Sequence, residues 1–501
     1  MTFSSVLPRE LQEIEAEILE YAGAEGLDFP EVRFVMLDFN QMNQIAAYDG
    51  FPSRYPHWRF GMEYERLRKS YAYGLHRIYE MVINTDPCYA YLLASNLPID
   101  QKLVMAHVYG HADFFKNNLW FDYTNRRMLD DMANHATRMR RYVDKYGLDE
   151  VETFVDRCLS LDNLIDLHGP GILRQPSRVP ATEDSEPDTG RLPNEREYMD
   201  SYINPPEYLE AQRERYKQEQ QKEQRFPANS QRDVLLFLLE YAPLASWQQD
   251  ILGIVRDESY YFSPQRQTKI MNEGWATYWH SHIMTRHALK PEELIDYADH
   301  HSGTVATSPG RLNPYKLGVE LFRDIEDRWN RGAFGAEYED CTDQRARANW
   351  DRQLGEGIKK IFEVRRIYND VGFIDEFLTR EFAEEHQLFT YRYNPHGNHY
   401  EIESREFEDI KRQLLFQLTN FGEPIIEVAD ANYQNRGELY LTHHWEEVDL
   451  RLDYAQATLE NLHALWDRPV HIETTLTEKG QALLSFDGKQ HTSRLLQRAK
   501  S

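Results

Sequence analysis

The chain has 501 residues and a formal net charge of −26 at pH 7. This length is enough for about two or three domains with apolar cores of their own. The negative charge disfavours nonspecific binding to nucleic acid and to anionic membranes, because both require a basic surface. The three cysteines show no CxxC spacing, which argues against a disulfide framework, a cysteine zinc site and an iron–sulfur cluster.

The N-terminal segment lacks the basic start and the apolar run of a secretory signal peptide. Nowhere do about eighteen apolar residues follow one another, which is the length that a membrane-spanning helix requires. We therefore expect a cytoplasmic protein that does not insert into membranes.

Residues 1–173 are predicted to form a mostly helical N-terminal domain. Residues 32–52 combine a short apolar run with turn residues and are expected to be strand or coil, and a short strand is expected near residues 81–84. An opening helix is predicted from apolar residues at helical spacing: Leu11, Ile14, Ile18 and Leu19.

A helix over residues 101–118 is predicted to carry the first candidate functional side chains. Asp100 has the side chain of a good N-cap, and Pro98 is expected to stop any earlier helix from running through. Further helices are expected up to residue 168, where a Gly-Pro pair ends helical structure.

Residues 174–231 contain few large apolar residues and much Pro, Glu, Gln and Arg. Such a segment cannot bury enough apolar surface to offset the entropy that it would lose on ordering. We predict a polar linker or an exposed insertion here.

Residues 232–384 return to dense apolar patterns and are predicted to form a helical core. Ser263 followed by Pro264 has the pattern of an N-cap and a first helical residue, so a new helix is predicted to start there. This helix is expected to carry the string NEGWATYWHSHIM and to end near His287.

The last predicted domain, residues 385–501, mixes strands and helices. The strands LFTYRYN and HYEIES precede a helix, and a hairpin is predicted where PIIEVAD and GELYLTHHW flank an Asn-Arg-Gly turn. Another helix and the strands VHIETTL and ALLSFDG follow. The order of strand, helix, two strands, helix and strand predicts a ferredoxin-like (split βαβ) domain with extra edge strands.

Two histidines provide the first indication of a metal site. His107 and His111 lie four residues apart, so on a helix both imidazoles project from one side and can converge on one ion. Apolar residues such as Leu103 and Phe114 lie on or beside that side, which predicts buried rings. A single buried histidine is more often hydrogen-bonded to the backbone or to a tyrosine, and the pair shifts the balance toward metal binding.

Glu273 is expected to supply a carboxylate ligand from another helix, because a buried Glu is rare unless it is paired. The following Gly274 lets another backbone come close. His280 lies two helical turns further along the same face and is a further candidate ligand. Two histidines four residues apart plus such a Glu form the ligand set of many hydrolytic zinc sites, so zinc is the expected metal, followed by iron or manganese.

Four long strings of this sequence resemble the stage V sporulation protein R family, and the resemblance covers nearly the whole chain. It implies a role in spore cortex formation or stress physiology. It also implies a setting that includes a serine protein kinase and a von Willebrand-type domain protein, and it implies no settled reaction. The strings are VYGHADFFKNN, ESYYFSPQRQTKIMNEGWATYWH, ANYQNRGELYLTHHW and LWDRPVHIET.

A second resemblance is to gluzincin peptidases, in which HExxH supplies two ligands and a later helix supplies the Glu, sometimes within an EGWA string. Here EGWA begins at Glu273, but HVYGH replaces HExxH, so that Val108 occupies the position of the general base. Without that carboxylate an activated water would lack its proton acceptor. Glu258 is the candidate replacement, with Asp257 and Asp113 as alternatives.

These candidates also have plainer explanations. Asp257 and Glu258 fit an ion pair with Arg256 or a solvated helix end equally well. The hydroxyl groups of Tyr260, Tyr261 and Tyr278 are candidates for hydrogen bonding an oxyanion, and a packed aromatic layer is the alternative favoured for most of them.

Two functions follow from these observations. The first is a cytoplasmic metalloprotein with a zincin-like helical core that hydrolyses an amide, such as a peptide or a cell-wall precursor. The second is a non-catalytic structural or regulatory partner in a kinase-linked stress or sporulation assembly, in which any metal only stabilises the fold. The ligand spacing favours the first function, and the missing base at Val108 favours the second.

Overall fold

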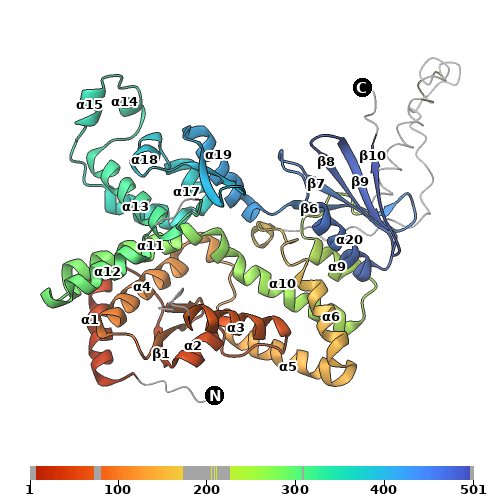
Figure 1. Ribbon diagram of the computed structural model, residues 1–501, viewed down its shortest axis with the longest axis horizontal. Coiled ribbons are helices and arrows are strands. Elements are labelled where there is room, and N and C mark those ends of the chain that lie inside the picture. The colour runs from red at the N-terminus through yellow and green to blue at the C-terminus, as the bar shows by residue number, and fades with distance from the viewer. Residues whose placement is uncertain are drawn as a thin grey trace, which may run out of the picture. The chain divides into compact units, whose positions relative to one another are not determined.

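The computed structural model describes residues 7–72, 80–172, 226–306 and 310–496, together with residues 205, 208 and 210 (Figure 1). Most of the predicted linker, residues 174–231, lies outside the described residues. The chain forms two compact units, and their bounds differ from those of the predicted domains, because residues 152–172 and 232–259 belong to unit 2 and residues 385–422 to unit 1. Unit 1 comprises Met1–Val151 and Tyr260–Gly422, and unit 2 comprises Glu152–Ser259 and Glu423–Ser501.

Most of the described secondary structure is helical, as predicted. Helices α6 (Leu148–Leu159) and α10 (Ser246–Gln267) each contain a boundary between the units, and unit 2 also holds α9 (Val234–Tyr241) and α20 (Leu452–Trp466). The helices of unit 1 are α1 (Arg9–Ala24), α2 (Phe39–Ala47), α3 (Trp58–Ala72), α4 (Pro98–Asn117), α5 (Met128–Tyr146), α11 (Lys269–Ile283), α12 (Leu294–Thr304), α13 (Pro314–Arg331), α14 (Ala336–Glu339), α15 (Gln344–Ala348), α16 (Gly357–Ile367), α17 (Asp370–Phe377), α18 (Arg380–Glu385) and α19 (Phe407–Leu418).

Unit 1 also holds a three-stranded sheet in the order β1-β3-β2, in which β1 (Val32–Leu37) is parallel and β2 (Glu80–Ile83) antiparallel to β3 (Cys88–Leu93). The strands at residues 32–37 and 80–83 confirm the sequence prediction. The central strand β3 was not predicted. Five of its six residues are buried, so it shows a continuous apolar run rather than alternation.

Helices α4, α11 and α13 pack side by side in unit 1, and small residues allow their close approach (Figure 1). A Cβ atom added to Gly110 of α4 would lie 2.7 Å from the Cα atom of Ala276 in α11. A Cβ atom added to Gly274 of α11 would lie 2.4 Å from the carbonyl carbon of Gly318 in α13. Gly274 was expected to admit another backbone, and that backbone belongs to α13.

Two predicted helix starts are wrong. Helix α4 begins at Pro98, since proline is well tolerated at a first helical position, and the carboxylate of Asp100 accepts a hydrogen bond from the backbone of Leu97. Helix α10 continues through Ser263 and Pro264 to Gln267. The next helix, α11, begins at Lys269, so the predicted N-cap at Ser263 lies inside a helix instead.

The C-terminal strands form a five-stranded sheet in unit 2, in the order β10-β9-β8-β7-β6. The predicted split βαβ arrangement is wrong, because β7 and β8 are directly hydrogen-bonded parallel neighbours with no strand between them. The predicted β6–β7 hairpin is confirmed, and β4 pairs with β5 in a separate sheet of unit 1. The strands are β4 (Thr390–Asn394), β5 (His399–Ser404), β6 (Ile425–Tyr433), β7 (Glu438–His444), β8 (Val470–Leu476), β9 (Gly480–Phe486) and β10 (His491–Leu495).

Within the described ranges, no helix combines the length and the hydropathy that crossing a membrane requires.

Candidate metal centre

Helix α4 presents two imidazoles toward the inside of unit 1. His107 and His111 are separated by about one helical turn, so their rings lie on the same side of α4. Only 2% of His107 and 4% of His111 is exposed. Their ring centroids lie 4.6 Å apart, which places both imidazoles at one point of the core.

Helix α11 brings Glu273 to the same point. Glu273 Oε2 lies 3.6 Å from His107 Nε2 and 3.5 Å from His111 Nε2. Each of the three residues offers one ligand atom, and these atoms all lie within 4.8 Å of one another. The structure therefore brings together the two histidines and the carboxylate that the sequence singled out.

The spacing and chemistry of these atoms suit a transition metal. Two ligand atoms about 2.1 Å from a tetrahedral zinc ion lie roughly 3.4 Å apart, close to the separations observed here. Glu273 is 6% exposed, and its Oε2 atom accepts no hydrogen bond from any residue that the structure describes. A buried charged oxygen without a partner is costly, and a cation at this point would compensate it.

The charge on Glu273 is favoured by its surroundings. Burial alone would raise the pKa of Glu273, but the imidazoles of His107 and His111 and the ammonium group of Lys269 outweigh burial and hold that pKa well below its ordinary value. Lys269 Nζ donates a hydrogen bond of 2.7 Å to Glu273 Oε1. That bond engages one carboxylate oxygen and leaves Oε2 directed at the imidazoles.

Asp370 fixes the start of the helix that carries Glu273. Its carboxylate accepts hydrogen bonds from the backbone N–H groups of Ile270, at 2.8 Å, and Met271, at 2.9 Å. These groups belong to the first turn of α11, where helical N–H groups have no partner within the helix. Burial raises the pKa of Asp370 to about 7, although the two hydrogen bonds act in the opposite direction.

The Nδ1 atom of His111 has a partner that orients the ring. Asn272 Oδ1 lies 2.9 Å from it. Because an amide oxygen only accepts hydrogen bonds, His111 Nδ1 carries the proton and donates. The lone pair of His111 is therefore on Nε2, the atom that faces Glu273. Metal-binding histidines commonly use their second nitrogen in this way.

His280 lies behind His107 and outside the cluster of ligand atoms. Its Nδ1 atom is 2.8 Å from His107 Nδ1, and its Nε2 atom is 3.3 Å from His301 Nδ1. If His107 Nε2 has its lone pair free for a metal, His107 Nδ1 donates to His280, and His280 Nε2 then donates to His301. The predicted ligand His280 is thus placed as a support for His107.

His280 is held in its neutral form. Burial lowers its pKa well below the ordinary value, and the neighbouring His107, His301 and Arg323 add to that effect. A neutral imidazole can both accept from His107 and donate to His301, whereas a protonated imidazole can only donate. The environment of His280 therefore matches its place between two other histidines.

Sequence comparison places this site in a known family. The family model described as "SpoVR like protein" matches residues 6–423, which include all of unit 1 from residue 6 onward. The chain belongs to the SpoVR family. A second model, "SpoVR-like C-terminal domain", matches residues 424–477 of this SpoVR protein.

Among curated proteins, the SpoVR chain is similar to "Uncharacterized protein YcgB" of Escherichia coli (strain K12). The two are 30% identical over 485 residues, which cover 91% of this chain and 90% of the relative. No solved structure matches the SpoVR chain.

The structure assigns Asp113 of this SpoVR protein to packing rather than to proton transfer. Asp113 Oδ1 accepts from the backbone N–H of Asp28 at 2.8 Å, and Oδ2 accepts from Trp275 Nε1 at 2.8 Å. Arg365 Nε lies 3.4 Å from the same Oδ2. Burial raises the pKa of Asp113 to about 6, against the opposing charge of Arg365. Asp113, the alternative general base, is therefore already engaged.

Other predicted groups lie away from the cluster or outside its set of ligand atoms. Val108 is fully buried in the apolar core. The hydroxyl group of Tyr278 donates to Glu326, and that of Tyr261 donates to the backbone oxygen of Asn84. Glu258 is a buried residue of α10 in unit 2, and its role as a general base stays a prediction.

Sequence reasoning missed three supporting residues. Lys269 stands one helical turn before Glu273, so its spacing alone could have indicated the ion pair. Asn272 is the direct neighbour of Glu273, yet its partner His111 lies 161 positions away. His301 belongs to α12, and no local pattern links it to His280.

Proposed function

We propose that this SpoVR-family protein binds one divalent transition metal through His107, His111 and Glu273. Zinc is the first candidate, followed by iron and manganese, because two imidazoles and one carboxylate suit all three metals. The observation that carries this proposal is the buried Glu273 Oε2 atom, which accepts no hydrogen bond within the described ranges and lies 3.5 and 3.6 Å from two imidazole nitrogens.

The function that this ligand set supports best is metal-dependent hydrolysis of an amide bond. The substrate class is a peptide or a cell-wall precursor, in the cytoplasm, in keeping with the sporulation setting that the family name implies. When bound, zinc supplies a Lewis acid that polarises a carbonyl group and activates water. The zincin-like description of the helical core belongs to this proposal and rests on the ligands alone.

The residues around the ligands have defined tasks in this proposal. Lys269 holds Glu273 Oε1, so that Oε2 is the atom offered to the metal. Asn272 and His280 hold the Nδ1 sides of His111 and His107, so that both Nε2 atoms point to the same place. Glu258 is the proposed proton acceptor.

The alternative is a non-catalytic function. Two observations favour it: the carboxylate of Asp113 is already hydrogen-bonded, and Val108 occupies the position of the usual general base. In this alternative the metal only stabilises the packing of α4 against α11. The protein then acts as a regulatory partner in an assembly with a serine protein kinase and a von Willebrand-type domain protein, and unit 2 supplies the binding surface.

Metal analysis of the purified full-length chain tests the site. We expect about one transition metal per chain in the wild type, and its loss in Glu273→Gln and His111→Ala. His287→Ala serves as the matched control, because His287 pairs with Glu25 and takes no part in the cluster. A wild-type protein that stays free of metal after supplementation with zinc, iron and manganese contradicts the metal site and the hydrolase.

Activity measurements separate the two functions. For the hydrolase, we expect cleavage of a peptide or muropeptide library that chelation abolishes and Glu258→Gln reduces, with the metal content unchanged in that variant. For the structural alternative, metal removal lowers the melting temperature, and no library member is cleaved by the metal-loaded protein.

A further inference from the structure

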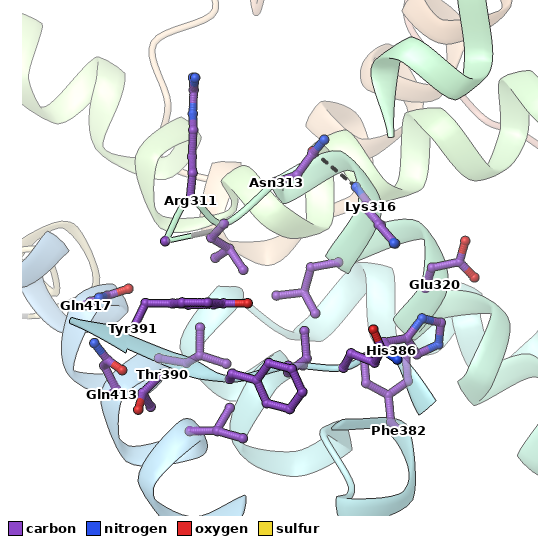
Figure 2. Close-up of a pocket in the computed structure, with 18 residues that line it drawn as sticks. Arg311, Asn313, Lys316, Glu320, Phe382, His386, Thr390, Tyr391, Gln413 and Gln417 are labelled. Atoms are coloured by element: carbon purple, nitrogen blue, oxygen red, sulfur yellow. Dashed lines mark hydrogen bonds between the residues drawn. The ribbon is translucent and has the colours of Figure 1, made fainter. Parts of the chain in front are cut away.

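Unit 1 contains a cavity of about 390 Å³, and none of the three residues of the metal-ligand cluster lines it. Its walls come from the loop before α13 and the start of that helix, from the segment between α18 and β4, and from α19 (Figure 2). Small-molecule sites in proteins typically have volumes of about 300–1,000 Å³. The proposed metal chemistry does not account for this cavity.

Much of the cavity lining is apolar. Such a surface favours the hydrocarbon or aromatic part of a ligand, because burying it removes apolar area from water. The apolar residues of the lining are Leu312, Leu317, Phe382, Leu388, Phe389, Ile410 and Leu414.

Lys316 supplies the positive charge of the cavity. Its ammonium group extends into the space between the walls (Figure 2), and no residue within the described ranges forms an ion pair with it. Lys316 also lies in the first turn of α13, where the aligned peptide dipoles add positive potential. A partly buried ammonium group without a counter-ion favours an anionic ligand.

The other charged groups of the lining, Arg311 and Glu320, do not change the net positive charge that Lys316 gives the cavity. The Arg311 side chain is directed away from the cavity (Figure 2). The carboxylate of Glu320 pairs with Arg323 Nη1 at 3.1 Å, so its charge is compensated. One net positive charge inside the cavity suits a singly charged anion better than a polyphosphate.

Three neutral side chains add hydrogen-bonding groups. The hydroxyl group of Tyr391 is directed into the cavity from the wall opposite Lys316 (Figure 2). Gln413 and Gln417 lie one turn apart on α19 and present amide groups. In the part of the chain that the structure describes, none of these three side chains has a hydrogen-bond partner. Amides and hydroxyls in this state suit a ligand that contains an amide of its own.

We propose that this cavity binds an N-acylated amino acid with an aromatic or branched aliphatic side chain. The carboxylate of the ligand pairs with Lys316, and its apolar side chain packs on the surface around Leu317 and Phe389. Its amide group bonds to Tyr391 and to the glutamines of α19. The site is independent of the metal centre and of the proposed hydrolysis.

Calorimetric titration of the full-length chain with N-acetyl-L-phenylalanine tests the proposal. We expect saturable binding of one molecule per chain with a Kd below about 1 mM. N-acetyl-L-phenylalaninamide has the same acetyl group and side chain but lacks the negatively charged carboxylate, and it is expected to bind at least about tenfold more weakly. Equal binding of the acid and the amide, or no saturable binding up to about 10 mM, overturns the proposal.

Variants locate the binding. Lys316→Gln is expected to weaken binding of the acid about tenfold, whereas Arg311→Gln, the matched control, leaves it unchanged because that side chain points away from the cavity. Inorganic phosphate is expected to give no saturable heat, and binding of phosphate as tight as that of the acid overturns the assignment of the ligand. Acetylation of lysines tests the site in the unaltered chain. N-acetyl-L-phenylalanine is expected to slow the acetylation of Lys316 and to leave that of the exposed Lys479 unchanged. An acetylation rate of Lys316 that is the same with and without the acid contradicts the site.

Discussion

Gly274 of α11 and Gly318 of α13 touch backbone to backbone, since a Cβ atom on Gly274 would lie 2.4 Å from the carbonyl carbon of Gly318. Gly274 directly follows Glu273, so this contact sets how closely the carboxylate-bearing helix packs on its neighbour. A Cβ atom on Gly318 would in turn lie 2.2 Å from the backbone oxygen of Ile270. Backbone atoms cannot rotate out of the way, and any side chain here would force the helices apart.

Gly274→Ala is therefore expected to destabilise the protein. Alanine improves helix propensity by about 1 kcal/mol, but overpacking a tight core costs about 1–3 kcal/mol, sometimes more. Here backbone atoms block the added methyl group, so overpacking dominates. Gly61→Ala in α3 is the control, because a Cβ atom there meets nothing within 4 Å. Thermal unfolding should show a lower melting temperature for Gly274→Ala only, and equal melting temperatures would contradict the packing argument.

The hydrogen bond from His111 to Asn272 leads to a second prediction. Asn272→Leu removes the acceptor that holds His111 Nδ1, while the leucine keeps a similar volume in a buried position. Loss of such a supporting partner typically lowers metal affinity about 10–100-fold. Asn272→Asp restores an acceptor and is expected to bind metal more tightly than Asn272→Leu. Competition with a chromophoric chelator measures both affinities, and equal values for the two variants would refute the role of Asn272.

His280 is expected to support His107 in the same way. His280→Phe keeps a ring of similar size but removes the atom that accepts from His107 Nδ1. We expect a loss of metal affinity of about 10–100-fold, with the metal still bound at saturation. If His280 were instead a ligand, the variant would lose the metal as Glu273→Gln does. Extended X-ray absorption of the zinc-loaded protein distinguishes the two cases by the number of imidazole ligands.

The cluster of His107, His111 and Glu273 was predictable because it rests on two local sequence patterns, the spacing of the histidines and the apolar surroundings of the glutamate. Two histidines one turn apart share a helix face whatever the tertiary fold, and a glutamate among tryptophans has to be buried with a partner. The contacts of His280 and Asn272 depend instead on the rotation of α11 against α4. That rotation follows from Gly110 and Ala276 at the helix crossing, which the sequence does not pair with each other.

The C-terminal sheet shows the same difference between local patterns, which the sequence reveals, and contacts between distant elements, which it does not. Period-two alternation and turn residues indicated the strands β6 to β9 and the hairpin that joins β6 to β7. The pairing of β8 directly with β7 depends on contacts across the sheet, and the same order of elements is compatible with several topologies. The order of elements therefore predicted an α+β sheet domain and failed to predict its strand arrangement.

Asp370 leads to a prediction about pH. Burial raises its pKa to about 7 in the folded chain, from a value near 3.8 without burial. Between these values the folded state binds a proton that the unfolded state has released, so the contribution of Asp370 to stability falls as pH rises from about 4 to about 7. The amide introduced by Asp370→Asn cannot titrate, and it keeps an oxygen for one of the two N–H groups of α11.

The stability difference between the wild type and Asp370→Asn should therefore depend on pH. We expect urea unfolding to show that the wild type loses more stability than the variant between pH 5 and pH 8, by at least about 1 kcal/mol, since each unit of pKa shift corresponds to about 1.4 kcal/mol. All other titratable groups are present in both proteins, so the comparison reports on residue 370. A difference between the wild type and the variant that stays constant over this range would show that the N–H groups of Ile270 and Met271 outweigh burial and keep Asp370 ionised throughout.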